Sequence, residues 1–470
     1  MEPATELRCT RHGKPTRITC VTCDTPICPE CAIRTPVGLK CPDHATKPPA
    51  PRSSKFGAVV VILGVAGILG FFQLARTTGR GEPATPPCPT ETAPDVGIGP
   101  AGGGDNWREI AASGLCGRYN AAVAWTGAEL LVWGGENCAG AACPTDLAPH
   151  LADGGAYRPA ADAWRKLATS PLSARSPAAT AWTGTELVVW GGVTADGALG
   201  DGAAYDPARD RWRPLSASPL RARGGAMSVW TGRELLVWGG GEGSESYVDG
   251  AAYDPATDRW RPMAEGPLAG RSRGVAAWTG REMVVWSGVD PAAGHEHDDG
   301  AAYDPATDRW RTIATSPLTG RNDPAAVWTG RELLVWGGNT VGSGLFDDGA
   351  AYDPAADRWR PVPTPPLSAR TAPAAVWSGR ELLVWGGISL PEEGSGPLDR
   401  IIERRTLLAP IGDGAAYDPA TDRWRPLEPV SLLGRGLPIA VWDGQGMIIW
   451  GGLVVVSSPA SASDGVRYTP

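Results

Sequence analysis

Eight cysteine and histidine residues near the amino terminus have the spacing of metal ligands. They form four pairs, each C-x-x-C or C-x-x-H: Cys9 with His12, Cys20 with Cys23, Cys28 with Cys31, and Cys41 with His44. Thiolate sulfur and imidazole nitrogen close tetrahedral structural zinc sites and leave no position for water. The spacing therefore predicts two structural zinc ions. Pairs that combine Cys with His favour zinc over iron. A disulfide cluster is the alternative, but it would not explain the two histidines.

This spacing resembles a B-box-type zinc finger. The segment PICPECAIRTPVGLKCPDH is similar to the amino-terminal zinc domain of some bacterial rhomboid-like membrane proteins. The resemblance implies a cross-brace, with Cys9, His12, Cys28 and Cys31 on one ion and Cys20, Cys23, Cys41 and His44 on the other. The last pair departs from the family pattern, which tends to end in histidines, so the resemblance supports the ligand identities more than their pairing.

Four further cysteines lie beyond residue 80, at Cys88, Cys116, Cys138 and Cys143. Zinc thiolates need a reducing compartment, whereas an even number of other cysteines suits an oxidising one. We expect disulfides between Cys138 and Cys143 and between Cys88 and Cys116, with free thiols as the alternative. The two groups of cysteines then lie on opposite sides of a membrane.

An arginine recurs in an L-x-x-R motif at regular intervals, and an Asp-Gly dipeptide recurs with it. The arginines are Arg118, Arg175, Arg223, Arg271, Arg321, Arg370 and Arg435, and the aspartates are Asp153, Asp201, Asp249, Asp299, Asp348, Asp413 and Asp464. A ring of seven arginines would attract an anion, so we include them in a candidate ligand face. The alternative, which we favour, is structural pairing of each arginine with one aspartate.

The segment from His295 to Asp299 also has metal-ligand character. His295 and His297, with carboxylates at Glu296, Asp298 and Asp299, could hold a divalent ion. We include His295 and His297 in the candidate ligand face, with a solvated loop as the favoured alternative. We find no G-x-S-x-G elbow and no P-loop pattern, and we assign no catalytic or cofactor-binding residue.

The elements that must position these residues follow from the tryptophans. All 21 fall into seven repeats with three tryptophans each, and the repeat interval is mostly 48 to 50 residues. The first series is Trp125, Trp182, Trp230, Trp278, Trp328, Trp377 and Trp442. The second follows eight residues later, from Trp133 to Trp450, and the third runs from Trp107 to Trp424. We expect these side chains to pack between repeats.

Each repeat contains four short apolar runs, with Gly-Gly after the second, and this pattern resembles the kelch repeat. The resemblance implies an all-β, seven-bladed propeller with four strands in each blade. AVWTG, ELLVWGG, DGAAYDP and DRWRPL are the expected strands, from the channel outward. Thr-Gly and Asp-Pro supply tight turns on one face. The longer, variable connections lie on the other face, which we expect to bind the ligand.

The two ends of the propeller sequence together supply the strands of one blade. NWREI at 106–110 precedes every inner strand, and the last repeat stops without an outer strand. We therefore predict that NWREI is the outer strand of the last blade and closes the propeller.

Residues Phe56 to Leu74 carry no charge and are long enough to cross a bilayer. A signal peptide or a buried helix is the alternative. Slightly more basic residues precede this run, which favours a cytoplasmic amino terminus. The predicted organisation is a zinc domain at 1–46, a basic linker at 47–55, a transmembrane helix at 56–75, a Pro/Gly-rich stalk at 76–105 and the propeller at 106–470.

The net charge of −8 and the absence of a basic cluster in the propeller exclude a nucleic-acid partner. We expect a single-pass protein of the cell membrane, with an external propeller that binds a protein or glycan and a cytoplasmic zinc finger that docks a protein. The alternative is an extracytoplasmic carbohydrate-active enzyme on the same propeller. It would need a perturbed carboxylate or histidine at the channel mouth.

Overall fold

The computed structural model describes residues 33–35, 38–40, 106–138, 149–176, 179–341, 344–389, 409–455 and 459–470. The chain divides into two compact units, Met1–Val61 and Ile62–Pro470. In the first unit, β1 (Ile33–Thr35) pairs with β2 (Gly38–Lys40) in an antiparallel hairpin. The other described strands all belong to the second unit.

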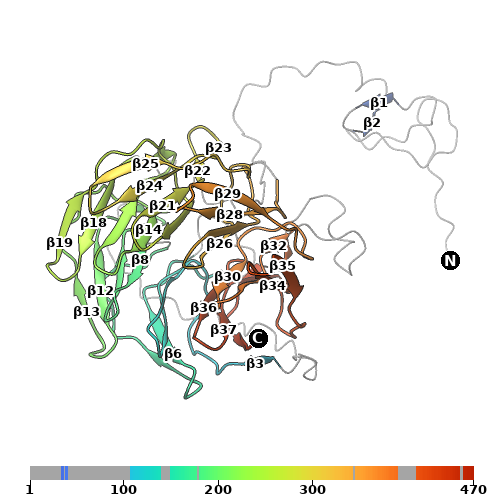
Figure 1. The fold of residues 1–470 in the computed structure, drawn as a ribbon. Helices are drawn as coiled ribbons and strands as arrows, with labels where there is room; N and C mark the ends of the chain where they lie inside the picture. Colours follow the sequence, from blue (N-terminus) through green and yellow to red (C-terminus); the bar gives the residue numbers. More distant parts are fainter. Residues whose placement is uncertain are drawn as a thin grey trace. The chain divides into compact units, whose positions relative to one another are not determined.

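Seven four-stranded antiparallel sheets make up the second unit, and each is one blade of a β-propeller (Figure 1). We number the blades 1 to 7 along the chain. The innermost strands are β4 (Ala122–Trp125), β8 (Ala179–Trp182), β14 (Met227–Trp230), β20 (Val275–Trp278), β26 (Ala325–Trp328), β30 (Ala374–Trp377) and β36 (Ile439–Trp442). The second strands are β5 (Leu130–Trp133), β9 (Leu187–Trp190), β15 (Leu235–Trp238), β21 (Met283–Trp286), β27 (Leu333–Trp336), β31 (Leu382–Trp385) and β37 (Met447–Trp450).

The third strands are β6 (Gly154–Arg158), β12 (Gly202–Asp206), β18 (Gly250–Asp254), β24 (Gly300–Asp304), β28 (Gly349–Asp353), β34 (Gly414–Asp418) and β40 (Gly465–Tyr468). The outermost strands are β7 (Ala163–Lys166), β13 (Arg211–Pro214), β19 (Arg259–Pro262), β25 (Arg309–Thr312), β29 (Arg358–Val362), β35 (Arg423–Pro426) and β3 (Trp107–Glu109). The four strands predicted for each repeat are therefore confirmed, and the fold is all-β.

Turn chemistry sets the ends of these strands. The glycine between the first and second strands has a positive φ, as at Gly280 (φ 92), a conformation that costs a glycine little. The turn between the third and outermost strands instead places an aspartate in the left-handed region, as at Asp258 (φ 52). Asp and Asn tolerate this conformation better than other side chains. Both turns lie on one face of the propeller, which we call the hairpin face. The opposite face, with the remaining connections, is the loop face.

The propeller closes through its two ends. The innermost strands contact one another in a complete ring, in which β36 of blade 7 meets β4 of blade 1. Strand β3 pairs with β40, with Trp107 opposite Tyr468 and Glu109 opposite Val466. Figure 1 shows the blue-green β3 beside the red strands of blade 7. The predicted closure by an amino-terminal outer strand is confirmed, and it removes the unpaired edge that the last blade would otherwise expose.

The junctions between neighbouring blades each contain one hydrophobic cluster, and these seven clusters form most of the described core. Every second-series tryptophan is fully buried, and a third-series tryptophan packs against it from an adjacent blade. Ring centroids are 5.4 Å apart for Trp133 and Trp212, and 6.3 Å apart for Trp385 and Trp107 in the closing blade. The first series, in contrast, stays partly exposed at the ends of the innermost strands.

Five two-stranded ribbons extend connections on the loop face. They are β10 (Val193–Thr194) with β11 (Gly197–Ala198), β16 (Gly241–Glu242) with β17 (Glu245–Ser246), β22 (Val289–Asp290) with β23 (His295–Glu296), β32 (Ile388–Ser389) with β33 (Ala409–Pro410), and β38 (Leu453–Val455) with β39 (Pro459–Ser461). No helix long and apolar enough to cross a membrane occurs in the part of the chain that the structure describes. The predicted span at 56–75 and the stalk at 76–105 lie outside that part.

Candidate ligand-binding surface

The seven repeated arginines are buried and paired. Arg223 donates through Nη1 to Asp249 Oδ1 at 2.8 Å and through Nη2 to Oδ2 at 3.2 Å. Its remaining bonds go to backbone carbonyls, those of Arg221 and Gly239 among them. The same ion pair joins each of the other six arginines to the aspartate of its own blade. The predicted structural pairing is confirmed.

This burial removes the arginines from the candidate ligand face. The side chains of Arg118, Arg175, Arg223, Arg271, Arg321, Arg370 and Arg435 are at most 1% exposed. Each guanidinium lies beneath its aspartate, and a solvent anion does not reach it. Their inclusion among the ligand-face residues was wrong, because sequence spacing shows neither the depth of a side chain nor its neighbours.

Blade 4 departs from this pattern around His297. Six blades have glycine where blade 4 has Ser287, which adopts a positive φ of 60 and donates its hydroxyl to the His297 carbonyl at 2.8 Å. Nη2 of Arg271 and Nε2 of His297 are buried without a hydrogen-bond partner. Burial, followed by the charge of Arg271, lowers the pKa of His297. The neutral form of the imidazole is therefore favoured.

The metal alternative at His295 to Asp299 finds no support. The two imidazole rings meet edge to face, with centroids 5.0 Å apart. Asp299 pairs with Arg271, and Glu296 accepts from Asn322 Nδ2 at 3.0 Å. Within the described residues, no group of three or more His, Cys, Asp or Glu side chains is arranged to hold a metal ion. The segment is part of the β22–β23 ribbon and its flanks.

A buried carboxylate in blade 1 was missed by the sequence reasoning. Glu136 is 2% exposed, and the Ser176 hydroxyl donates to its Oε1 at 2.7 Å. Burial, and then the Glu136 carboxylate, raise the pKa of Tyr119. Burial lowers the pKa of His150, and Glu136 opposes that shift. A buried carboxylate beside a tyrosine and a histidine is typical of a catalytic site. Here, however, the Glu136 carboxylate is shielded from solvent and already accepts hydrogen bonds from Ser176 and Asn120. Its hydrogen bonds join the segments that precede the innermost strands of blades 1 and 2.

The structure describes two of the four cysteines that we expected to form disulfides. Cys116 and Cys138 both take part in disulfides. Cys88 and Cys143, their expected partners, lie outside the described residues, and so do the eight predicted zinc ligands. The pairing scheme therefore stays a prediction.

A second repeated network joins the blades on the hairpin face. Arg261 donates to both carboxylate oxygens of Glu234, at 3.0 and 2.7 Å, and to the hydroxyl of Tyr303 in the next blade at 3.1 Å. Tyr303 in turn donates to Asp308 at 2.6 Å. Burial, reinforced by Asp308, raises the pKa of Tyr303 to about 12, so its hydroxyl keeps the proton that it donates. Such side chains hold neighbouring blades together.

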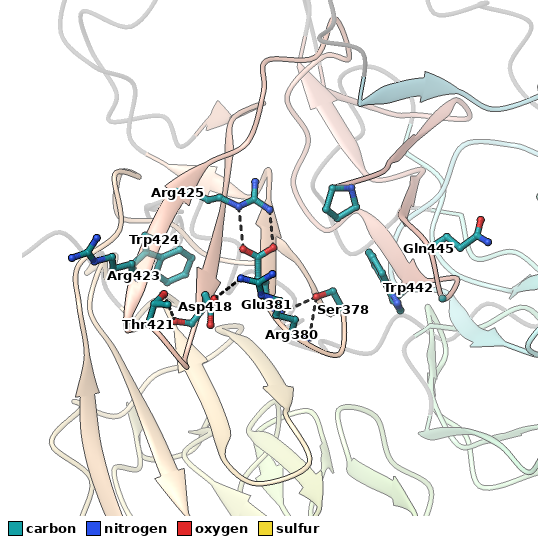
Figure 2. Close-up of a pocket in the computed structure, with 12 residues that line it drawn as sticks. Ser378, Arg380, Glu381, Asp418, Thr421, Arg423, Trp424, Arg425, Trp442 and Gln445 are labelled. Carbon is teal, nitrogen blue, oxygen red and sulfur yellow. Dashed lines mark hydrogen bonds and ion pairs between the residues drawn. The ribbon is translucent and has the colours of Figure 1, made fainter.

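An open cleft of about 720 Å³ lies on the hairpin face between blades 6 and 7 (Figure 2). Trp424, Arg425 and Glu381 come from blade 6, and Trp442 and Gln445 come from blade 7. Blade 7 has no turn between its third and outermost strands, because β3 and β40 belong to opposite ends of the chain. The sequence placed the variable surface on the loop face, so it did not predict this cleft.

Comparison with known families gives one match, at the amino terminus. Residues 4–36 match the family model described as B-box zinc finger. That match includes the first six predicted zinc ligands and ends before Cys41 and His44. The chain is therefore a seven-bladed β-propeller with a B-box zinc finger at its amino terminus. The family implies structural zinc binding, and its Cys and His side chains are the donors that zinc prefers.

Solved structures also match the chain, and "Structure of YjhT" is among them. It shares 18% sequence identity with a TM-score of 0.49, and the alignment covers 65% of this chain and 97% of that one. No curated protein matches the chain.

Proposed function

We propose that this chain is a membrane-anchored binding protein. Its propeller takes a protein or glycan ligand outside the cell, and its zinc finger docks a cytoplasmic protein. Propellers and zinc fingers both serve widely as interaction domains. The repeated Trp, Gly-Gly and Asp-Pro positions, with their buried tryptophans and tight turns, support a propeller of the kelch type.

The membrane anchor in this proposal is the uncharged run from Phe56 to Leu74. Cysteine chemistry supports its orientation. Cys116 and Cys138 of the propeller are disulfide-bonded, which suits an oxidising compartment, whereas zinc thiolates suit the reducing cytoplasm. A membrane-impermeant thiol reagent applied to intact cells after mild reduction tests this. Labelling should occur at Cys138 and be absent at Cys20, and the reverse pattern would contradict the orientation.

The zinc finger would hold two ions through Cys9, His12, Cys28 and Cys31, and through Cys20, Cys23, Cys41 and His44. The donor set fits structural zinc, since each site would have four protein ligands. A domain of this size buries little apolar surface, so the bound metal would supply much of its folding free energy.

The open cleft of the hairpin face is the observation that carries the binding role. Trp424 and Trp442 give it apolar and aromatic surface, and Arg380, Arg423 and Thr421 give it polar groups. Indole rings and arginines are the side chains most enriched at binding hot spots. The buried arginines pair with their aspartates, and the Arg, Glu, Tyr and Asp side chains between blades pair with one another. These two repeated networks favour a rigid scaffold over a catalyst.

A cleft-filling variant tests the role. Gln445 is exposed at the edge of the cleft, and Thr185 occupies the same hairpin position in blade 2. The full-length protein in nanodiscs is applied to protein and glycan arrays. We expect at least one ligand whose binding is lost in Gln445→Trp and kept in Thr185→Trp. Equal binding by both variants, or no ligand at all, would refute the proposed function.

A further inference from the structure

The first-series tryptophans form a collar at the channel mouth on the hairpin face. Each ends an innermost strand and remains partly exposed. The third-series indoles all donate to backbone carbonyls, as Trp260 Nε1 does to Ser216 at 3.1 Å. None of the seven collar indoles donates to another residue in the described part of the chain, so their N–H groups remain available to a ligand.

A hollow of about 270 Å³ opens within this collar at blades 3 to 5. Its walls include Trp230, Trp278 and Trp328, with Ala276 and Ala326 between them. Every side chain that lines it is apolar or aromatic, and no carboxylate, amide or hydroxyl is among them. A sugar inserted here would leave most of its hydroxyl groups unpaired, which costs free energy. An apolar side chain of a peptide suits the hollow better.

Exposed arginines accompany the collar on one side only. The residue after the hairpin glycine is Arg233, Arg281, Arg331 and Arg380 in blades 3 to 6, and these side chains are 82, 80, 79 and 78% exposed. Blades 1, 2 and 7 have Ala128, Thr185 and Gln445 at this position. The arginines therefore belong to the arc that surrounds the hollow, and the repeat alone does not require them.

The charge that this arc presents to solvent is positive. Each of the four arginines has one aspartate nearby, at 3.2 to 3.8 Å, but those aspartates are only 10 to 15% exposed. The neighbouring glutamates are already engaged by the outer-strand arginines, as Glu282 is by Arg311. Figure 2 shows the last member of the arc, where Arg380 of blade 6 and Trp442 of blade 7 line one cleft.

We propose that this arc binds an acidic peptide segment that inserts one apolar side chain into the hollow between Trp230, Trp278 and Trp328. The inference rests on the proposed binding role and names its ligand chemistry. Carboxylates and backbone carbonyls of the peptide accept from the arginines and the free indoles, and the apolar residue fills the hollow. A membrane surface fits less well, because insertion into a bilayer needs protruding apolar side chains and these are recessed.

The test uses full-length protein in uncharged nanodiscs and fluorescent heptapeptides with a central Leu or Phe flanked by Asp and Glu. We expect saturable binding that weakens as ionic strength rises. The double variant Arg281→Gln/Arg331→Gln should weaken it about tenfold, since each exposed charge contributes modestly. Arg209→Gln, on the same face in blade 2, is the matched control and should leave the affinity unchanged.

A second pair of variants tests the hollow. Ala326→Leu narrows it, and Ala440→Leu places the same substitution at the same register of blade 7. Ala326→Leu should lower the affinity about tenfold and remove the preference for a central apolar residue, while Ala440→Leu should do neither. Unchanged thermal unfolding of all variants separates these effects from misfolding.

Three results would overturn the inference. They are equal binding of peptides in which Lys replaces the acidic residues, unchanged affinity in Ala326→Leu, and arginine-dependent binding of anionic vesicles without peptide binding. If an array ligand is blocked by Gln445→Trp but not by the arginine variants, the binding role stands and the acidic-peptide inference fails. Absence of any array ligand would instead remove the role itself.

Discussion

Replacing Asp249 by alanine should destabilise the propeller by about 3 kcal/mol. Arg223 is 1% exposed and donates to the carbonyls of Arg221, Gly239 and Asp249 at 3.0, 2.9 and 3.4 Å. Those bonds persist in the variant, and the two bonds to carboxylate oxygens at 2.8 and 3.2 Å are lost. Hydrogen bonds to charged groups contribute about 1.5–3 kcal/mol each. Loss of a buried ion's partner costs about 3–5 kcal/mol, and the 51% exposure of the aspartate calls for the lower end.

Two further variants make the prediction quantitative. In blade 4 a single carboxylate oxygen of Asp299 contacts Arg271, at 2.7 Å, so Asp299→Ala should cost roughly half as much. Asp196 is exposed in a β-turn and has no ion pair in the described structure, so Asp196→Ala should cost less than about 0.5 kcal/mol.

The assay is equilibrium urea unfolding of the full-length protein in detergent, followed by near-ultraviolet circular dichroism. The change in unfolding free energy is taken from the shift in midpoint at constant slope. The reasoning is refuted if Asp249→Ala is as stable as Asp196→Ala. It is also refuted if Asp299→Ala is the most destabilised of the three, because the number of carboxylate bonds would then not set the loss.

Three further predictions concern other parts of the chain. Trp107→Ala should lower the thermal midpoint, and increase proteolysis at β3, more than Trp212→Ala does. The reason is that Trp107 belongs to β3, which closes the ring without a covalent turn to its neighbouring strand. Equal effects of the two variants would contradict this prediction. The pKa of His297 is lowered from 6.5 by burial and Arg271, so the unfolded state binds more protons just below pH 6.5. Stability should therefore fall as pH drops through that range, and in urea titrations His297→Phe, the residue type of blade 5, should flatten the slope. Metal analysis should find two zinc ions per chain, Cys20→Ser should retain one, and a chelator should leave propeller unfolding unchanged.

The local elements of the propeller were predictable because each strand carries its own signal. Short apolar runs, a glycine in each hairpin and an Asp-Pro turn set the ends of strands such as β20 and β24. The closure by Trp107 to Glu109 also followed from counting strands. The last repeat has only three strands, and the segment before the first repeat supplies the fourth.

The binding surface was not predictable in the same way. The sequence singled out the seven repeated arginines, but their burial depends on how the Gly-Gly carbonyls and the Asp-Gly turn fold over them. It treated the tryptophans as one core set, whereas the second series is buried and the first series forms a partly exposed collar. The exposure of each tryptophan depends on which strand of the blade carries it and on the side chains of the neighbouring blade that pack against it.

The sequence by itself therefore determined the number of blades and the order of their strands, because these depend on residue types at short, regular separations. It also predicts the donor set for zinc. Only the tertiary structure decided which face is hollowed. Arg380 and Trp442 are 62 residues apart in sequence, yet they line one cleft because blades 6 and 7 pack side by side. The shape and charge of that surface come from contacts between blades, and no single repeat contains both partners.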